Sequence, residues 1–242
     1  METNVASQDG RRAPYVAVVS GSPVPASRTL ALARHVGARL SADGAGVRYV
    51  DVRDLPADDL LGARPATAPT KSACALIEGA AGVVLVTPVF NASYSGVLKA
   101  FLDILPRCGL RGKLALPLAV GGTVAHMLVI DYALRPVLAS MGMPHVFGGV
   151  FLLDSWLQRH DSGELVIEQQ IAERLHESLH ELAGAIQGRS SPGEPREVTI
   201  PRAEKAPNGA SRGGRRRRGG RDGLHDRGAS VMSSAPSGTR RA

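Results

Sequence analysis

This sequence lacks several features that are common in secreted, membrane-embedded and metal-binding proteins. Its two cysteines, Cys74 and Cys108, are too few for a disulfide framework or a cysteine metal site in 242 residues. No apolar run approaches the roughly 18 to 20 residues that span a bilayer, and residues 1–14 contain no apolar signal core. We therefore expect a cytoplasmic protein with a flexible segment at residues 1–14. Cys74 lies in a helical apolar pattern and is expected to be buried.

Arrangements of catalytic side chains are missing as well. The sequence offers no Ser-His-Asp set, no paired carboxylates and no cluster of metal ligands. The glycine-containing turn at residues 21–29 matches neither G-x-G-x-x-G nor G-x-x-x-x-G-K-[ST], the two commonest nucleotide-binding signatures. The sequence therefore predicts no catalytic acid or base and no metal site.

What the sequence does contain is a buried strand that ends in a polar turn. The strand is the continuous apolar run 82–86, the kind expected when both faces of a parallel sheet are covered. Pro88 is expected to stop it, and Pro88, Val89 and Phe90 give the turn a flat apolar wall. Hydrogen-bonding groups follow directly, from Asn91, Ser93, Tyr94, Ser95 and Gly96. Because ligands of open α/β sheets lie at the carboxyl ends of strands, this turn suits a planar, heteroatom-rich ligand. An ordinary strand-to-helix loop is the alternative.

A second turn follows the first predicted strand, before a helix that is expected to begin near Thr29. The hydroxyls of Ser22, Ser27 and Thr29 and the cation of Arg28 converge on the first amides of that helix. Helix N-termini bind phosphate because these amides are unpaired and the helix dipole adds roughly half a positive charge. A single phosphate without a metal is the simplest ligand for this turn. The alternative is a helix cap by Ser27 or Thr29, which does not require Arg28.

A third turn, Gly121-Gly122-Thr123, ends another buried strand. Two glycines allow the backbone to approach a ligand closely, although a Gly-Gly pair is also common in plain turns. His126, just beyond, is expected either to face a ligand or to cap and pack the helix that follows.

These three segments resemble the NADPH-dependent FMN reductases of flavodoxin-like fold, in particular the branch that serves two-component alkanesulfonate monooxygenases. The resemblance lies in residues 21–29 (GSPVPASRT), 87–96 (TPVFNASYSG) and 121–138 (GGTVAHMLVIDYALRPVL), and it covers roughly residues 15–153. Two positions depart from the family pattern. Val24 stands where the family often has a basic residue, which leaves Arg28 as the only cation on that turn, and Phe90 stands where Tyr is common.

The resemblance implies that the protein reduces FMN with NADPH and supplies reduced FMN to a flavin-dependent monooxygenase. It also implies a homodimer or homotetramer, in which Tyr132 forms a π-bulge at the subunit interface and favours flavin release. An ordinary interfacial aromatic is the alternative for Tyr132. Backbone amides at Phe90, Asn91, Gly122 and Thr123 are the expected donors to the polar edge of the flavin. The expected cofactor-binding residues are Ser22, Ser27, Arg28, Thr29, Pro88, Val89, Phe90, Asn91, Gly121, Gly122 and Thr123.

Strands and helices alternate along residues 15–188, which we expect to form one α/β domain. Strands are predicted at 15–21, 47–52, 82–87, 114–120 and 146–153, and helices at 29–41, 70–80, 95–105, 124–141 and 164–187. This pattern predicts a five-stranded parallel sheet with helices on both faces, in the flavodoxin-like order 2-1-3-4-5. Residues 54–69 are expected to form a long surface connection.

Two other functions fit the same motifs. One is an NAD(P)H-dependent quinone or azo-compound reductase with bound FMN, which shares every motif above. The other is a non-catalytic electron carrier of flavodoxin type, which is less favoured because flavodoxins use a T-x-T-G-x-T phosphate loop and are typically acidic. Residues 1–188 have a net charge of only −1.

The remaining residues, 189–242, form a basic tail of different composition. The tail carries 13 Lys and Arg against five Asp and Glu, so it accounts for the positive charge of the chain. It is rich in Arg, Gly, Ser and Pro and has too few large apolar residues to fold, so we expect disorder. Segments of this composition can bind nucleic acid weakly and nonspecifically, and a silent solvated extension is the favoured expectation.

Overall fold

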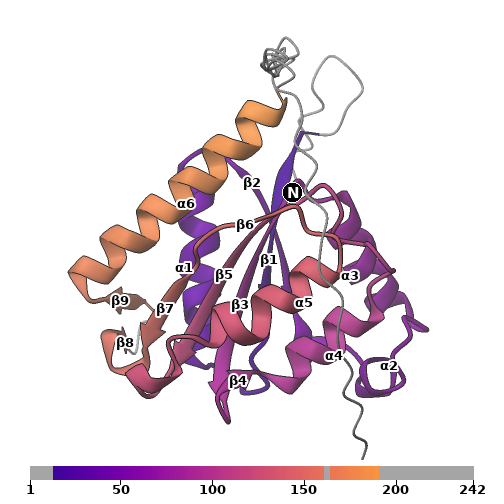
Figure 1. The fold of residues 1–242 in the computed structure, drawn as a ribbon, viewed down its shortest axis with the longest axis horizontal. Helices are drawn as coiled ribbons and strands as arrows, with labels where there is room; N and C mark the ends of the chain where they lie inside the picture. The colour runs from indigo at the N-terminus through magenta and orange to yellow at the C-terminus, as the bar shows by residue number, and fades with distance from the viewer. Residues whose placement is uncertain (1–12, 161–163, 191–242) are drawn as a thin grey trace, which may run out of the picture. The chain divides into compact units, whose positions relative to one another are not determined.

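The computed structural model describes residues 13–160 and 164–190 of the chain. The predicted flexible segment 1–14 and the predicted tail 189–242 lie almost wholly outside the described residues, so their disorder stays a prediction. The described part is built around one twisted sheet (Figure 1). None of its helices is long and apolar enough to cross a membrane.

The central sheet is parallel and has the order β2-β1-β3-β5-β6, with β7 also pairing with β5. This order confirms the predicted flavodoxin-like sheet. Its parallel strands are β1 (Tyr15–Ser20), β2 (Gly46–Asp51), β3 (Gly82–Phe90), β5 (Leu114–Gly121), β6 (His145–Val146) and β7 (Val150–Leu153).

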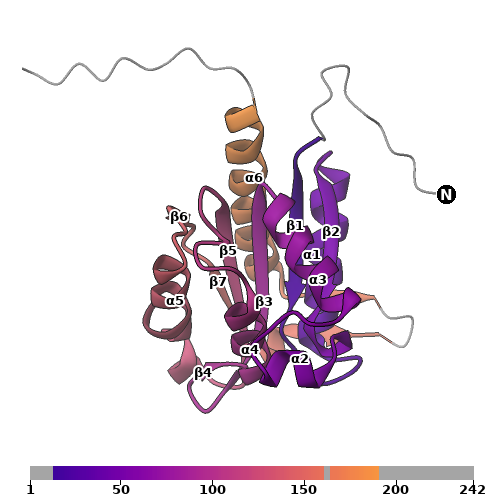
Figure 2. The ribbon, with the colours of Figure 1, turned by 90° about the vertical axis from the view of Figure 1, so that its right-hand side faces the viewer.

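Helices cover both faces of the sheet because the strands are apolar on both sides (Figure 1 and Figure 2). Val16 and Val84 point to the face that packs against α1 (Arg28–Ala42) and α6 (Gln169–Ser190). Ala17 and Val83, the alternate residues, point to the face of α3 (Ala68–Gly79), α4 (Gly96–Ile104) and α5 (Arg135–Ser140). The period of two along a strand therefore divides the core into two layers.

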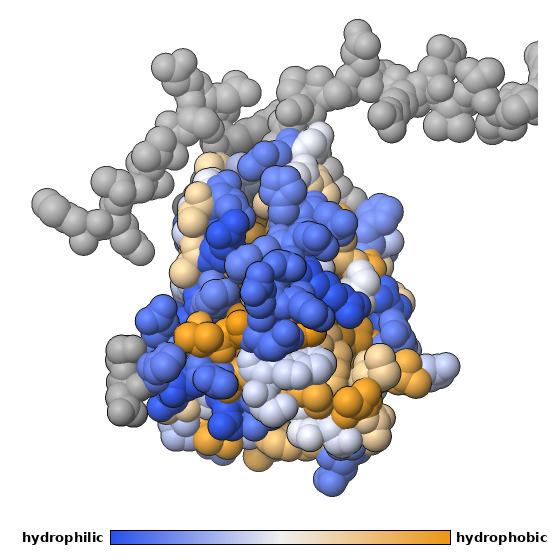
Figure 3. Space-filling view, turned by 90° about the vertical axis from the view of Figure 1, so that its left-hand side faces the viewer, coloured by the Kyte–Doolittle hydropathy of each residue, from blue (hydrophilic) through white to orange (hydrophobic). Residues whose placement is uncertain are grey.

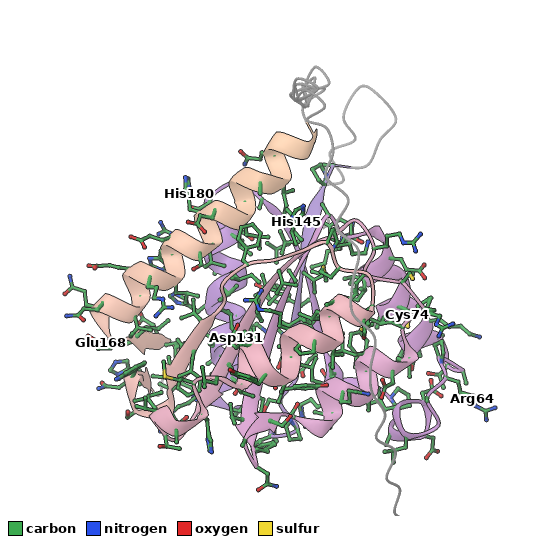
Figure 4. The ribbon with its side chains drawn as sticks, viewed as in Figure 1. Arg64, Cys74, Asp131, His145, Glu168 and His180 are labelled. Carbon is green, nitrogen blue, oxygen red and sulfur yellow. The ribbon has the colours of Figure 1, made fainter. Side chains whose placement is uncertain are left out.

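Cys74 is buried, as predicted, and it belongs to the second of these layers. Its side chain is only 7% exposed, and Figure 4 shows where it lies on α3. Both Cys74 and Cys108 are free thiols.

The expectation that Pro88 stops its strand is wrong. β3 continues through Pro88 to Phe90, because the chain then turns back as β4 (Ser93–Tyr94) and pairs with it antiparallel. Val89 faces Tyr94 and Phe90 faces Ser93 in this small hairpin. The returning strand supplies partners beyond the proline, so the apolar wall is part of a strand and not of a loop.

The predicted strand 146–153 is divided into β6 and β7. Residues 147–149 leave the strand path, and Gly149 has a positive φ of 77°. Arg135 stabilises this irregular segment by donating hydrogen bonds to the carbonyl oxygens of Val146, Phe147 and Gly148, at 2.8, 3.1 and 3.3 Å. The same guanidinium forms an ion pair with Asp131 at 3.0 Å.

Two predicted helices also differ from the structure. The segment 124–141 consists of a 3₁₀ turn η2 (Val124–His126), a π-helix η3 (Ile130–Leu134) and α5. The π-helix contains Tyr132, so the bulge implied by the family resemblance is present. The last helix begins at Gln169 and not at residue 164, because β8 (Leu157–Arg159) and β9 (Leu165–Ile167) first form an antiparallel pair.

The connection at residues 54–69 is more ordered than the predicted surface loop. It follows the 3₁₀ turn η1 (Val52–Asp54) and contains the helix α2 (Ala57–Leu61). Asp59 of α2 is only 4% exposed. Its Oδ2 accepts hydrogen bonds from the hydroxyls of Thr67 and Thr70, both at 2.6 Å, and from the Thr67 N–H at 2.8 Å. A buried carboxylate therefore ties the connection to the start of α3.

We expect Asp59 to make the fold sensitive to acid. The hydrogen bonds from Thr67 and Thr70 lower the pKa of Asp59 from 3.8 to about 2. A group with a lowered pKa stabilises the folded state above its unfolded pKa and loses that contribution as the pH falls toward the folded value. Asp59→Asn should therefore lower the Tm at neutral pH and flatten the fall of Tm between about pH 4 and pH 2. Asp58→Asn, at an exposed position of the same helix, is the control, and parallel Tm curves for wild type and Asp59→Asn would contradict this role.

Candidate functional site

The carboxyl ends of β1, β3 and β5 border a pocket of about 610 Å³, which we call the strand-end pocket. Figure 1 shows the carboxyl end of β3, where the chain continues into β4, at the lower end of the sheet. Of the residues expected to bind a cofactor, it is lined by Ser22, Ser27, Arg28, Thr29, Pro88, Val89, Phe90, Gly121 and Gly122. Three turns that are far apart in the sequence therefore meet in one cavity.

Ser27 has the capping role that was the alternative to ligand binding. Its Oγ accepts a hydrogen bond from the Leu30 N–H at 3.1 Å, so Ser27 is the N-cap and α1 begins at Arg28, one residue before the predicted start. The cap does not close the site, because the Ser27 O–H remains a donor group. Ser22 is buried, and its Oγ accepts a hydrogen bond from the Val24 N–H at 3.2 Å. The turn is thus held rigid at the N-terminus of a 15-residue helix.

Arg28 is held by an acidic residue that the sequence did not point to. Its Nη1 lies 2.7 Å from Oδ2 of Asp154, and its Nε donates a hydrogen bond to the carbonyl oxygen of Leu157 at 3.1 Å. Asp154 also lines the strand-end pocket. The cation therefore has a structural partner, and its charge is partly balanced before any ligand binds.

Arg28 is the only cation on the turn itself, but a second cation reaches the turn from β8. Arg159 of β8 also lines the strand-end pocket, and its guanidinium donates a hydrogen bond to the carbonyl oxygen of Ala26. Ala26 itself has a positive φ of 53°. With Arg28, Arg159 and Asp154 in the lining, the phosphate end of the pocket keeps one net positive charge.

The first and second turns are joined by Ser95, the N-cap of α4. The Ser95 N–H donates to Thr87 Oγ1 at 3.0 Å, and the Ser95 hydroxyl donates to the Gly21 carbonyl oxygen. Gly21 is required at this junction, because a Cβ there would lie 2.7 Å from Cβ of Leu98. These contacts fix the apolar wall of Pro88, Val89 and Phe90 relative to the phosphate turn.

The glycines of the third turn have different roles. A Cβ on Gly121 would lie 2.8 Å from the ring of Phe151, so Gly121 is required by packing. Nothing lies within 4 Å of the Cβ position of Gly122, which leaves its backbone accessible from the pocket. Thr123 accepts a hydrogen bond from the Ala125 N–H at 3.4 Å and caps η2.

Two of the expected cofactor-binding residues, Asn91 and Thr123, lie beside the lining and not in it. Asn91 is exposed at the tip of the β3–β4 hairpin, where its φ is 48°. The sequence reasoning in turn missed Asp154 and Arg159. Both residues follow the last predicted parallel strand, which places them at the same edge of the sheet as the three turns. This position could have identified them as candidates for the site.

The described pocket can bind a phosphate at one end and a flat ring at the other. Hydroxyls, helix amides and two guanidinium groups meet at the first end, and Pro88, Val89 and Phe90 form the wall at the second. Among the described residues, no group of three or more His, Cys, Asp and Glu could hold a metal ion. Such an arrangement orients bound groups, and the pocket itself presents no acid–base pair.

Comparisons with known proteins agree with this geometry. A model of the family described as NADPH-dependent FMN reductase matches residues 14–158. The chain is 39% identical to the FMN reductase (NADPH) of Pseudomonas putida over 74% of this chain and 92% of that protein. It is 40% identical to the FMN reductase (NADPH) of Escherichia coli over 58% of this chain and 73% of that protein.

Solved structures are similar over the same region. An NADH:FMN oxidoreductase in its apo form has a TM-score of 0.65 and 38% identity, covering 72% of this chain and 90% of that one. A flavodoxin from the domain Archaea, at 12% identity and a TM-score of 0.50, shares the fold over 72% of this chain and 99% of its own.

Proposed function

This chain belongs to the NADPH-dependent FMN reductase family, and on that premise we propose that the strand-end pocket binds FMN and releases it after reduction. The protein is an oxidoreductase that reduces FMN with NADPH. NADPH supplies a hydride and FMN accepts it at N5, so the two substrates carry the chemistry. The task of the protein is to hold the two rings at reacting distance, which can contribute roughly 7 to 11 kcal/mol.

The observation that carries the proposal is the convergence of a phosphate turn and an apolar wall in one pocket. The FMN phosphate is assigned to the N-terminus of α1, where Ser22, Ser27 and Thr29 supply hydroxyls. Arg28 and Arg159 supply the positive charge there. A pocket with these two ends suits a ligand that has a phosphate and a ring joined by a chain.

The flavin ring is assigned to the wall of Pro88, Val89 and Phe90. Backbone N–H groups of Phe90 and Asn91 on one side, and of Gly122 and Thr123 on the other, are the donors that we propose for its polar edge. Such donors stabilise the negative charge of the reduced flavin without transferring a proton. The nicotinamide ring is proposed to stack on the opposite, open face of the flavin.

We further propose that reduced FMN passes to a flavin-dependent monooxygenase, such as an alkanesulfonate monooxygenase. Loose binding of FMN is the physical requirement for such a transfer. Two features support it: Phe90, the aromatic residue of the lining, is 46% exposed, and Asp154 balances part of the charge at the phosphate end.

We propose that a second copy of the chain covers an apolar surface beside the pocket, giving a homodimer or homotetramer. This surface, the η2–η3 patch, consists of Val124, Met127, Leu128 and Tyr132, all more than half exposed. Their spacing of three and four residues places them on one side of the helical segment. Contiguous apolar side chains of this kind mark interaction sites. The π-helix η3, which contains Tyr132, packs against β5, whose carboxyl end borders the pocket, and against β4, which pairs with β3.

We also propose that the protein is located in the cytoplasm. Both thiols are free, as they are in proteins kept in a reducing compartment. NADPH as the electron donor is consistent with that compartment.

The identity of the electron acceptor is tested by comparing FMN with a quinone. We expect the purified full-length chain to oxidise NADPH rapidly when FMN is added and to reduce a soluble quinone only when FMN is also present. The reason is that FMN acts as a substrate that must be supplied, and reduced FMN then reacts with the quinone in solution. The measurement is the rate of NADPH oxidation, followed by the loss of the absorbance of the reduced nicotinamide. Rapid quinone reduction by protein that retains its own flavin would instead support a quinone or azo-compound reductase.

A further inference from the structure

Two histidines stack on each other where α6 crosses α1 (Figure 1). The ring centres of His35 on α1 and His176 on α6 lie 5.8 Å apart, and the two ring planes are inclined by only 11°. The Nε2 atom of each ring is buried, and neither has a hydrogen-bond partner among the described residues. A protonated imidazole carries an N–H on both nitrogens, so a charge on either ring would come with a buried, unsatisfied donor.

The surroundings of the histidine pair disfavour a positive charge on either ring. The nearest charged groups on the α1 side are Arg39 and Asp43, which pair with each other at 3.6 Å. Burial is the largest cause that lowers the pKa of His35 below 6.5, followed by the effects of His176 and Arg39. Burial and then Arg39 also lower the pKa of His176, and Asp43 opposes them. Both rings are therefore neutral near neutral pH.

The other elements around the pair add no clear excess of negative charge. Their charged or titratable groups are Arg34, Arg159 and Glu164, in the lining of a groove that His35 also lines, and Glu173 and His180, one helical turn from His176 on α6. A second proton-binding ring at the centre of such a mixed set is repelled chiefly by its stacked partner.

The histidine pair lies beside the apolar contact that holds α6 on the sheet. Leu175, Leu179 and Leu182 of α6 are fully buried in the layer that contains Leu32 and Val36 of α1. Figure 3 looks onto the side of the molecule that carries α6, β8 and β9, where hydrophobic side chains gather among hydrophilic ones in the lower half. Because the leucine contacts remain when the rings are charged, acid should loosen α6 without unfolding the chain.

We propose that the histidine pair is an acid-sensitive contact that controls how firmly the phosphate end of the strand-end pocket is held together. This inference rests on the proposed function of that pocket. With both rings neutral, the stack holds α6 against α1. As the pH falls below about 6.5, the rings take up protons, the two charges repel, and their N–H groups are satisfied only by water. The contact between α6 and α1 then opens.

The phosphate end is connected to α6 through β8 and β9. β9 directly precedes α6, and the N–H of Glu168, between them, donates a hydrogen bond to the Trp156 carbonyl oxygen at 3.0 Å. β8, which pairs with β9, carries Arg159 into the pocket lining. The carbonyl oxygen of Leu157, also in β8, accepts a hydrogen bond from Arg28 Nε at 3.1 Å. Loosening of α6 therefore reaches the segment that positions both cations of the phosphate end.

The direction of the pH dependence follows from the lowered pKa values. A histidine with a lowered pKa binds its proton more readily once it is released from the fold, so the contact is strongest above about pH 6.5 and weakens as the pH falls through that value. FMN should be affected more than riboflavin, because the phosphate end is what loosens. The phosphate of FMN itself takes up a proton near about pH 6, but it does so with every variant alike.

The test follows the helix contact and flavin binding separately, in the full-length chain at about pH 7.5 and about pH 5.5. Hydrogen–deuterium exchange of the α6 amides, corrected for the intrinsic effect of pH, reports the contact, and quenching of flavin fluorescence gives the Kd of FMN and of riboflavin. The reference is the double variant His35→Phe, His176→Phe, which keeps two stacked rings that cannot be charged. At the lower pH, α6 of wild type should exchange about fivefold faster, and its Kd for FMN should rise about fivefold more than that of the double variant. The Kd of riboflavin should change less than about twofold.

His180→Phe is the matched control, because His180 is exposed one helical turn further along α6 (Figure 4), and it should respond to acid as wild type does. His176→Gln removes one of the two charges and keeps a polar side chain, so it should respond about half as strongly, and it replaces the double variant if that variant does not fold.

An equal acid response of wild type and the double variant would overturn the inference, as would α6 exchange in wild type that does not rise at the lower pH. Faster α6 exchange without the additional loss of FMN affinity would also overturn it, because the helix contact would then not control the phosphate end. Absence of FMN binding at either pH would refute the proposed function of the pocket and with it the control of FMN, and the exchange of α6 would still decide whether acid opens the histidine pair.

Discussion

Replacing Arg28 by alanine should raise the Kd of FMN by about 10- to 150-fold and leave the Kd of riboflavin nearly unchanged. A charge-assisted hydrogen bond to phosphate contributes about 1.5 to 3 kcal/mol to binding. Riboflavin has no phosphate, so its binding does not include this contribution. The structure adds a second reason for a large effect. Arg28 forms an ion pair with Asp154, which also lines the pocket, so the variant leaves a carboxylate close to the bound phosphate. Titration of flavin fluorescence with both ligands measures the difference directly.

The role of Asp154 provides the control for this prediction. In the double variant Arg28→Ala, Asp154→Asn, the repulsion between carboxylate and phosphate is gone, so part of the lost FMN affinity should return. Arg159→Ala should also weaken FMN more than riboflavin, since Arg159 lines the same end of the pocket. Equal weakening of FMN and riboflavin by Arg28→Ala would show that Arg28 positions the β8 segment through Leu157 and does not meet the phosphate.

The sheet could be predicted because its strands carry continuous apolar runs. Residues 82–86 and 114–120 are buried on both faces and read as parallel strands without any knowledge of their neighbours. The short elements could not be predicted in this way. β4, β8 and β9 have only two or three residues each, too few for a period of two to stand out, and their pairing depends on partners elsewhere in the fold. The end of β3 was misplaced at Pro88 for the same reason. The residues of β3 beyond Pro88 pair with β4, which is too short to be predicted from its own sequence.

The candidate site was predictable where its residues are neighbours in the sequence. The phosphate turn and the apolar wall each form one continuous segment, and both line the strand-end pocket. Asp154 and Arg159 were missed because they reach the phosphate turn from 126 and 133 residues away. No local pattern records such a contact. Ser27 both caps α1 and lines the pocket. The sequence offered these two roles as alternatives, because a serine at this position is compatible with either one.

Wild-type protein should purify largely colourless, with FMN bound at a Kd on the order of 1 μM, or about −8 kcal/mol. The proposed cause is the π-helix η3, whose i to i+5 hydrogen bonding accommodates an extra residue and leaves the backbone beside the pocket adaptable. Tyr132, in the middle of this segment, is 79% exposed, so its side chain contributes little to packing within one copy of the chain. A regular helix in its place should hold β4, and with it the wall of the pocket, more firmly.

Deletion of Tyr132 is therefore expected to return the segment to regular α-helix, to tighten FMN binding about tenfold and to give a yellow protein that transfers reduced flavin more slowly. Tyr132→Ala keeps the number of residues and removes only the side chain, so it should shift the colour in the same direction but less. Leu128→Ala, in the η2–η3 patch and outside the π-helix, is the control: it should weaken subunit association in sedimentation and leave the FMN affinity unchanged. If wild type is already bright yellow, and neither change at Tyr132 alters colour or steady-state turnover, the π-helix only packs the fold and flavin release must depend on the pocket alone.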